Sequence, residues 1–392
     1  MYLLFFIAIV FNIFFNTVVP YSLGYEGVKT LSFLPILIYF IINLINKKIR
    51  YDKVAIYIIL FAVIIFIFKW SIEQDYFHKV TLLMIIPMIV SMCFENLTKK
   101  ELTLLRTITI LFFITECSLS IIEWTLNHNF FISGDTEETD YWMSLGFFRS
   151  TSLLGHPLGN AQIVAVFMAF IAFSDFKKKY IQVILFFLGY VSLFCFNARG
   201  ATLVITLFIV PFFLWKINKA TPKSKKWIIK LGVFCMFCAM FYAVTQTPLG
   251  GRLMNSEIVD SSSKTRLEVF DFYKYYQQKD DFIWGHPDNY EYMIEKLGGG
   301  AAGVENGVIV MILEYGIIFT FPMLILLFMF QYRKLSVYSN LEKWLLLMVF
   351  YFIGAMNPNL AKPFQWLFWF YAFYVFRPEL HVHSQQTKII SS

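Results

Sequence analysis

Apolar residues occur along the chain in about twelve long runs, which short polar or charged segments separate. A bilayer core of roughly 30 Å needs about 20 apolar residues in each helix, so each run predicts a membrane-spanning helix. A transmembrane β-barrel would instead show alternating segments of about ten residues. The pattern therefore predicts an all-α, polytopic membrane bundle. The runs lie near residues 2–19, 30–46, 53–69, 79–94, 106–126, 157–174, 180–197, 200–216, 227–246, 306–331, 341–357 and 360–376.

The composition agrees with a membrane protein. The 392 residues are 58% hydrophobic, 20% aromatic and 15% charged, whereas soluble domains are roughly 45–50% apolar and about 25% charged. The same figures exclude disordered, collagen-like and disulfide-scaffold proteins. All five cysteines fall inside apolar runs. Cys235 and Cys238 have CxxC spacing without a second pair, so we interpret them as small buried residues and expect no metal or redox site.

The net charge of +7 indicates orientation in the membrane. If both termini are cytoplasmic, the even-numbered connections between spans hold most of the 33 basic residues, as the positive-inside rule requires. Nucleic-acid binding is therefore a poor explanation of the charge. The first apolar run has no basic segment before it, so we expect a first span rather than a cleaved signal peptide.

Two of the predicted extracytoplasmic segments are long, residues 127–156 and 247–305. The first ends in a stretch that contains Arg149, His156 and Pro157. Proline suits the first turn of a helix, so Arg149 and His156 are expected just before a helix N-terminus at the outer membrane surface. Free N–H groups and the helix dipole favour an anion there. An arginine that snorkels to the membrane interface is the alternative interpretation.

Arg199 lies in a turn, residues 197–200, that divides the apolar stretch 180–216 into two helices. This turn is too short to carry the arginine far from the bilayer. A charge at membrane depth is costly and usually faces the bundle interior or a polar cavity. We therefore favour a functional role for Arg199 over snorkelling.

The large loop, residues 247–305, contains Thr265 and Glu268 at the spacing of a capping box, which predicts an amphipathic helix over about 265–278. Arg266 falls in the first turn of this helix, where a cation opposes the helix dipole. A local conflict of this kind indicates a functional site.

Carboxylates follow at the end of the large loop and inside the next span. Glu305 precedes that span and Glu314 lies about two turns deeper, while Glu116 and Glu123 share one face of the fifth span. Carboxylates in a bilayer are functional candidates, although Glu305 is equally explained by favourable interaction with the helix dipole.

The candidate residues therefore combine arginines and carboxylates at the outer leaflet. Arginine stays charged and its planar fork suits phosphate oxygens. Metal-ligand spacings, a P-loop and a GxSxG hydrolase motif do not occur in the sequence. Metal-independent transfer from a lipid pyrophosphate donor fits these residues best.

The order of these motifs resembles the superfamily of O-antigen polymerases (Wzy type) and O-antigen ligases, which are bacterial membrane glycosyltransferases. Members have ten to fourteen helices and a large periplasmic loop between late spans. The stretches 148–161, 197–201 and 265–268 are similar to the three arginine motifs of the family, with 284–286 following the third. Residues 305–316 are similar to the end of the family's loop.

The resemblance implies a multi-pass protein of the bacterial inner membrane that acts in lipopolysaccharide or surface-polysaccharide biosynthesis without a cofactor. Its partners would be an undecaprenyl-pyrophosphate-linked oligosaccharide, membrane lipid and a chain-length regulator protein. Arg199 and Arg266 would hold the pyrophosphate and Glu305 would be the catalytic base. The remaining candidates, which would bind pyrophosphate or glycan, are Arg149, His156, His286 and Glu314.

Three other functions stay open at this point, one of them a non-enzymatic membrane scaffold in which the arginines would be dispensable. Glu305 stands where ligases commonly have a histidine, which favours polymerase over transfer of the glycan to lipid A-core. A transporter of lipid-linked oligosaccharide would show internal repeats and broken helices with charges near the midplane. The sequence has no visible repeat, and the candidate residues gather towards one face.

Overall fold

The computed structural model describes most of the apolar runs and part of the loops between them. All regular elements in these residues are helical. The described residues are 34–46, 49, 51–69, 79–131, 148–176, 178–220, 273–274, 276, 280–286, 288–296, 306–361 and 363–378, with single positions at 227, 234, 238, 241, 242 and 245.

Three of the described helices are long and apolar enough to cross a membrane: Lys99–Leu126, Arg199–Lys219 and Gly307–Val337. Four shorter apolar helices accompany them: Leu34–Ile45, Thr81–Glu95, Pro157–Phe173 and Lys179–Cys195. The protein thus has the helical, apolar character predicted from its sequence. The predicted run 2–19 and most of 227–246 lie outside the described residues, and a total of about twelve spans stays a prediction.

The chain forms two compact units, which share helices α7 and α19. The first unit takes residues 1–109, 266–343 and 354–392. Its described helices are α3 (Leu34–Ile45), α4 (Lys53–Lys69), η2 (Thr81–Ile85), α6 (Ile86–Glu95), the start of α7 (Lys99–Leu126), α16 (Asp281–Trp284), α17 (Asp288–Lys296), α18 (Gly307–Lys334), η7 (Leu335–Val337), the start of α19 (Asn340–Ala355), η8 (Pro358–Ala361) and α20 (Pro363–Phe376).

The second unit takes residues 110–265 and 344–353. Beside the remainder of α7 and most of α19, its described helices are α9 (Pro157–Phe173), α10 (Lys179–Cys195), α11 (Arg199–Val204), η3 (Ile205–Ile209) and α12 (Val210–Ala220). The last three follow one another without interruption, and together they form the second of the three long apolar helices.

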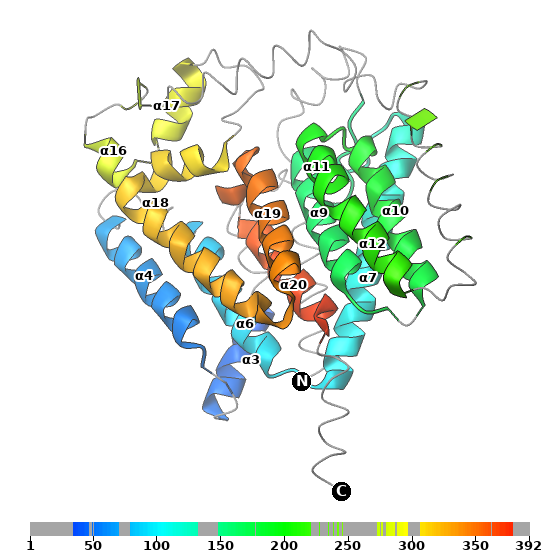
Figure 1. Ribbon diagram of the computed structural model, residues 1–392. Helices are drawn as coiled ribbons and strands as arrows, with labels where there is room; N and C mark the ends of the chain where they lie inside the picture. Colours follow the sequence, from blue (N-terminus) through cyan, green and yellow to red (C-terminus); the bar gives the residue numbers. More distant parts are fainter. Residues whose placement is uncertain are drawn as a thin grey trace, which may run out of the picture. The chain divides into compact units, whose positions relative to one another are not determined.

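Helix α9 is the centre of the second unit. Every residue of α9 except Leu158 is buried, as expected for a helix that is apolar on all sides. Helix α10 packs against it (Figure 1), and Gly189 allows the close approach. A Cβ atom at Gly189 would lie 2.7 Å from Cγ of Met168 and 2.8 Å from Cζ of Phe113.

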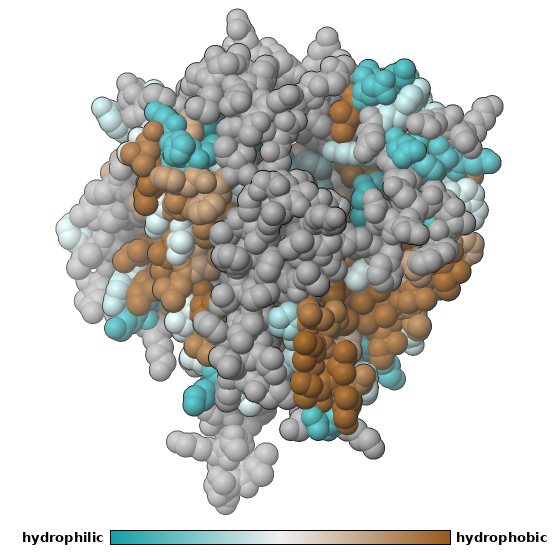
Figure 2. Space-filling model, turned by 180° about the vertical axis from the view of Figure 1, so that it is seen from behind, coloured by the Kyte–Doolittle hydropathy of each residue, from teal (hydrophilic) through white to brown (hydrophobic). Residues whose placement is uncertain are grey.

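In the first unit, α4 and α18 lie side by side (Figure 1). Phe319 of α18 packs against Phe61 and Phe68 of α4, with ring centroids 6.4 and 5.9 Å apart. Apolar side chains also cover the outer sides of α3 and α4, where Ile41 is 50% and Ile67 66% exposed. Figure 2 shows this apolar surface as a continuous brown area at the lower right. A surface of this kind suits contact with lipid chains.

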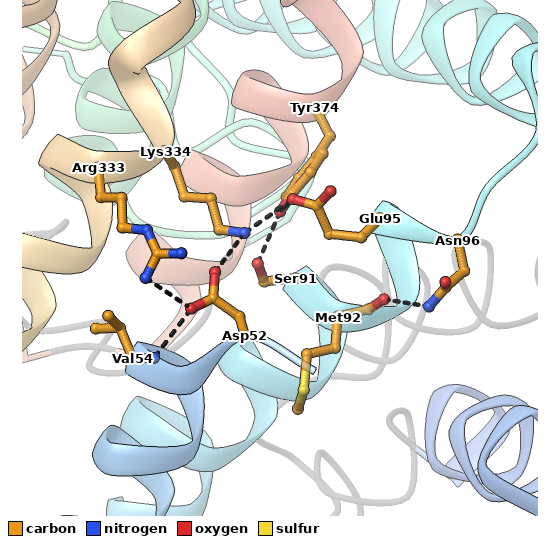
Figure 3. Close-up of polar contacts among 9 residues, drawn as sticks. All are labelled: Asp52, Val54, Ser91, Met92, Glu95, Asn96, Arg333, Lys334 and Tyr374. Carbon is orange, nitrogen blue, oxygen red and sulfur yellow. Dashed lines mark hydrogen bonds and ion pairs between the residues drawn. The ribbon is translucent and has the colours of Figure 1, made fainter. Parts of the chain in front are cut away.

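Four helix ends of the first unit meet in a cluster of charged and polar groups (Figure 3). Lys334, at the end of α18, donates to Asp52 before α4 (2.9 Å) and to Glu95 at the end of α6 (2.8 Å). Arg333 also pairs with Asp52 (3.4 Å), and Tyr374 of α20 donates to Glu95 (2.9 Å). These contacts join helices that are far apart in the sequence.

The Asp52 carboxylate should stabilise the first unit in a pH-dependent way. Burial raises its pKa, but the hydrogen bond and charge of Lys334, with Val54 N–H and Arg333, outweigh burial and hold the pKa below its ordinary value. A lowered pKa contributes stability above the unfolded pKa of about 4, and that stability is lost as the pH falls through the native pKa. We expect Asp52→Asn to destabilise the protein by about 1–2 kcal/mol at pH 7.

Thermal unfolding in detergent between pH 7 and pH 3 measures this effect. The difference between wild type and Asp52→Asn should shrink below about pH 4, where the wild-type carboxylate becomes protonated. Glu295→Gln, at an exposed position of α17, is the matched control. A difference that stays constant down to pH 3 would contradict the predicted linkage.

Candidate functional site

The two arginine-bearing turns of the second unit are joined by hydrogen bonds, although about 50 residues separate them in the sequence. Ser150 N–H donates to the carbonyl of Cys195 at the end of α10 (3.0 Å). Arg149 Nε donates to the carbonyl of Phe196 (3.4 Å). Arg199 begins α11 three residues after Phe196. The structure thus joins the two chain segments that carry Arg149 and Arg199.

Arg149 is only 5% exposed. Its guanidinium lies against the C-terminal end of α10, where the last carbonyls of the helix favour a cation. The snorkelling alternative for Arg149 is therefore wrong. The observed contact of this side chain is with Phe196, three residues before the start of α11 at Arg199.

Glu123 organises the loop that carries Arg149. This buried carboxylate accepts hydrogen bonds from the hydroxyl of Ser150 and from the N–H groups of Thr151 (3.0 Å), Ser152 (2.8 Å) and Phe130 (2.8 Å). Ser152 has a left-handed backbone (φ 42°), which these bonds hold in place. The sequence predicts a functional carboxylate at Glu123. In the structure, the hydrogen bonds of this carboxylate go to the loop that carries Arg149 and fix its backbone.

His156 is the N-cap of α9. Its Nδ1 accepts the N–H of Gly159 (3.3 Å), and Pro157 occupies the first helical position, so the predicted helix start is confirmed. A capping imidazole satisfies one of the free N–H groups at the helix start. The sequence predicts both this position of His156 before the helix and substrate binding by its side chain, and the contact observed in the structure is the helix cap. The starts of α9 and α11 lie at the same end of the second unit, because the intervening α10 runs back between them.

Helix α18 of the first unit is interrupted at Gly316, which has φ 75° and ψ 166°. Only glycine adopts this backbone conformation readily. Gly285 (φ 75°) packs directly against the break, and a Cβ atom on either glycine would lie 2.2 Å from backbone atoms of the other segment. Thr320 Oγ1 donates to the carbonyl of Met311 (2.8 Å) and so links the two sides of the break.

Lys69, the last residue of α4, holds the segment before His286 in place. Its ammonium group donates to the carbonyls of Trp284 and Gly285, the latter at 2.6 Å, and the residue is 1% exposed. His286 N–H donates to the carbonyl of Leu313 in α18 (3.0 Å). The predicted 284–286 motif is therefore fixed onto the broken helix by backbone contacts, and Lys69 is a residue that sequence reasoning missed.

Glu314 is brought next to this segment. Its carboxylate pairs with Lys79 (3.0 Å), whose side chain is 39% exposed. Burial and the negative charge of Glu314 raise the pKa of Tyr290 in α17. The imidazole of His286 itself faces Asp288, with Nδ1 3.5 Å from Oδ2. Glu314 and His286 thus belong to one group around the break in α18.

The remaining predicted residues lie outside the described part of the chain. These are Arg266, most of the predicted amphipathic helix 265–278, and Glu305. The predicted helix after Glu305 is confirmed, and its N-cap is Asn306, whose Oδ1 accepts the N–H groups of Val308 and Ile309 (both 3.1 Å). Among the described residues, no group of three or more His, Cys, Asp or Glu side chains is placed to hold a metal ion.

Models of known protein families and curated proteins were compared with the chain, and neither comparison gave a match. The kind of ligand that suits the candidate site therefore follows from its residues and their contacts alone. In the second unit, an arginine stands at the start of a membrane-length helix, beside a second helix start and a loop held rigid by buried bonds. This arrangement favours an anion with several oxygens, such as a phosphate or pyrophosphate.

Proposed function

We propose that the protein is a membrane glycosyltransferase of the O-antigen polymerase type, which extends a surface polysaccharide. The observation that carries the proposal is the union of the Arg149 and Arg199 turns at the starts of α9 and α11. A pyrophosphate on a lipid carrier needs a fixed cation, and Arg199 at the start of α11 is the residue of this end that supports the proposal.

The reaction joins a glycan on undecaprenyl pyrophosphate to a lipid-linked repeat unit. The bond between C1 of the donor sugar and the pyrophosphate oxygen breaks, and a bond from C1 to an acceptor hydroxyl oxygen forms with inversion. Arg199 and Arg266 stabilise the charge on the departing undecaprenyl pyrophosphate. Glu305 takes the acceptor proton as general base, and His286 and Glu314 bind the glycan. Arg149 positions the Arg199 turn.

This proposal includes the location and orientation of the protein. The site faces the periplasm, and both termini are in the cytoplasm of a bacterial cell. The ion-pair cluster of the first unit supports the predicted order of spans, because Asp52, Glu95 and Lys334 lie at helix ends that the prediction assigns to one side of the membrane. These helix ends lie together in the structure, as expected for ends on the same side of a membrane bundle.

A transporter of lipid-linked oligosaccharide is the second candidate. The observation that favours it is the interrupted helix α18, with the Lys79–Glu314 pair beside the break. Transporters commonly use broken helices with charged groups near the binding site. The arginines at the helix starts of the second unit favour the glycosyltransferase.

Deleting the gene and typing the surface polysaccharide tests the proposal. We expect single repeat units on the cell surface in place of long chains, and long chains should return with the wild-type gene. A surface without any attached glycan would indicate a ligase or a transporter instead. Long chains of normal length in the deletion strain would contradict all three functions.

A further inference from the structure

The end of the second unit opposite the Arg199 turn carries a basic surface that the proposed function does not use. We call it the basic end and define it by Lys178, Lys179, Lys216 and Lys219. The first two stand at the start of α10 and the other two at the end of α12. Lys216 acts electrostatically on Lys179, so the two helices present their charges close together.

Structural contacts hold these lysines in place. Lys216 Nζ donates to the carbonyl of Phe173 at the end of α9 (2.6 Å) and lies 5.8 Å from the centre of its ring. Lys219 Nζ lies 5.3 Å from the ring of Trp215. Among the described residues, the acidic side chain that acts on Lys179 is Asp175, in the turn before α10. The lysines of the basic end therefore outnumber this acidic neighbour.

The sequence continues this imbalance. Residues 216–230 contain six lysines and neither Asp nor Glu, and residues 177–179 are three consecutive lysines. Like charges repel and cost free energy when they gather. Clusters of four to eight basic residues directly beside a membrane-spanning helix are the pattern that attracts anionic lipid headgroups.

An apolar surface begins directly beside the basic end. Along the continuous helix from α11 to α12, the side chains of Leu207, Phe208 and Trp215 are 57%, 41% and 56% exposed. On α10, Tyr180 and Ile184 are 57% and 60% exposed, one helical turn apart. Trp and Tyr are enriched at the headgroup level of a bilayer. Lysines next to aromatic and aliphatic side chains follow the same order as the headgroups and acyl chains of a bilayer.

We propose that the basic end binds the headgroup of an anionic phospholipid of the adjacent leaflet. The phosphate would lie between Lys179 and Lys216, and the acyl chains would follow the exposed apolar side of α12. Charge complementarity selects an anionic over a zwitterionic headgroup, and the continuous apolar surface selects a lipid over a free phosphate. The binding requires no activity of the Arg199 site and is independent of the proposed glycosyl transfer.

Lipid retention by the purified full-length protein tests this site. The protein is equilibrated in nanodiscs of equal parts phosphatidylglycerol and phosphatidylcholine, extracted, and analysed by native mass spectrometry. We expect the wild-type protein to retain more phosphatidylglycerol than phosphatidylcholine. The Lys179→Gln/Lys216→Gln pair should retain at least about tenfold less, since each lysine contributes to attraction by an anionic surface. The Lys53→Gln/Lys99→Gln pair removes the same charge at exposed positions of the first unit and should behave like wild type.

A second pair, Lys178→Gln/Lys219→Gln, separates binding from folding because both side chains are exposed. It should also lower phosphatidylglycerol retention relative to the control pair while unfolding at the wild-type temperature. Retention equal to the control in both basic-end pairs would overturn the proposal. Equal retention of phosphatidylglycerol and phosphatidylcholine by the wild-type protein would overturn it as well.

Discussion

Cells that carry Arg199→Ala should make single repeat units instead of long surface polysaccharide. Arg199 begins the helix α11 at the joined turns, and the proposed reaction leaves a pyrophosphate there. Removing one preorganised group that stabilises developing charge lowers a rate by roughly 10²–10³-fold. At that rate, long chains should disappear from gels of surface glycan, and Arg199→Lys should restore them only in part because lysine lacks the planar fork.

The control for this experiment is Arg333→Ala. Arg333 is also an arginine, with a side chain 59% exposed and paired with Asp52 in the first unit. It should leave the glycan ladder unchanged at equal protein levels. If cells with Arg199→Ala and cells with Arg266→Ala both make normal long chains, the proposed pyrophosphate site is contradicted.

Replacing Gly316 by alanine should disrupt the first unit severely, although the change adds a single methyl group. The new Cβ would lie 2.2 Å from the carbonyl oxygen of Ile283 and 2.4 Å from the carbonyl carbon of Trp284, both main-chain atoms. The backbone at Gly316 is also nearly restricted to glycine. Strain and overlap together should cost about 3 kcal/mol or more.

Fluorescence-detected size-exclusion chromatography of a fusion protein, with thermal unfolding in detergent, measures this loss. We expect little monodisperse protein for Gly316→Ala, and the same for Gly285→Ala, which meets the same contact from the other side. Ile318→Ala, at a 43% exposed position of the same helix, should resemble wild type. A Gly316→Ala protein as stable as Ile318→Ala would show that α18 does not require its break.

Local signals in the sequence predicted much of the helical architecture. The run 53–69 matches α4 (Lys53–Lys69), because charged residues stand at both of its ends. The start of α9 was predictable from Pro157, since proline is favoured in the first turn. The turn at 197–200 was predictable from its polar and glycine residues, and Asn197 indeed has a left-handed backbone (φ 54°).

Contacts between distant segments were not predictable. The break in α18 occurs inside an apolar run, and the residue packed against it is Gly285, 31 positions away. Nothing local distinguishes Lys69 from any lysine at the end of a span, yet it binds two carbonyls more than 200 residues further along. Glu123 likewise looked like an unpaired carboxylate in a membrane helix, because its partners come from the loop around Ser150.

For the two arginines of the second unit, too, one feature was predictable from the local sequence and another depended on contacts between distant segments. The turn that carries Arg199 was a local prediction, and the structure confirms it. That Arg149 serves the neighbouring turn depends on the packing of α9 against α10, which no single segment encodes. The segments that carry Arg149 and Arg199 are thus joined only by the tertiary packing of the second unit.

Reconstitution of the purified protein tests the central proposal most directly. Liposomes would contain the protein and an undecaprenyl-pyrophosphate-linked repeat unit, and the products would be resolved by mass. We predict glycans of two or more repeats, with one undecaprenyl pyrophosphate released for each bond formed, and neither product with Arg199→Ala. Repeat units that cross the bilayer without becoming longer would contradict the proposed glycosyl transfer and would identify a transporter.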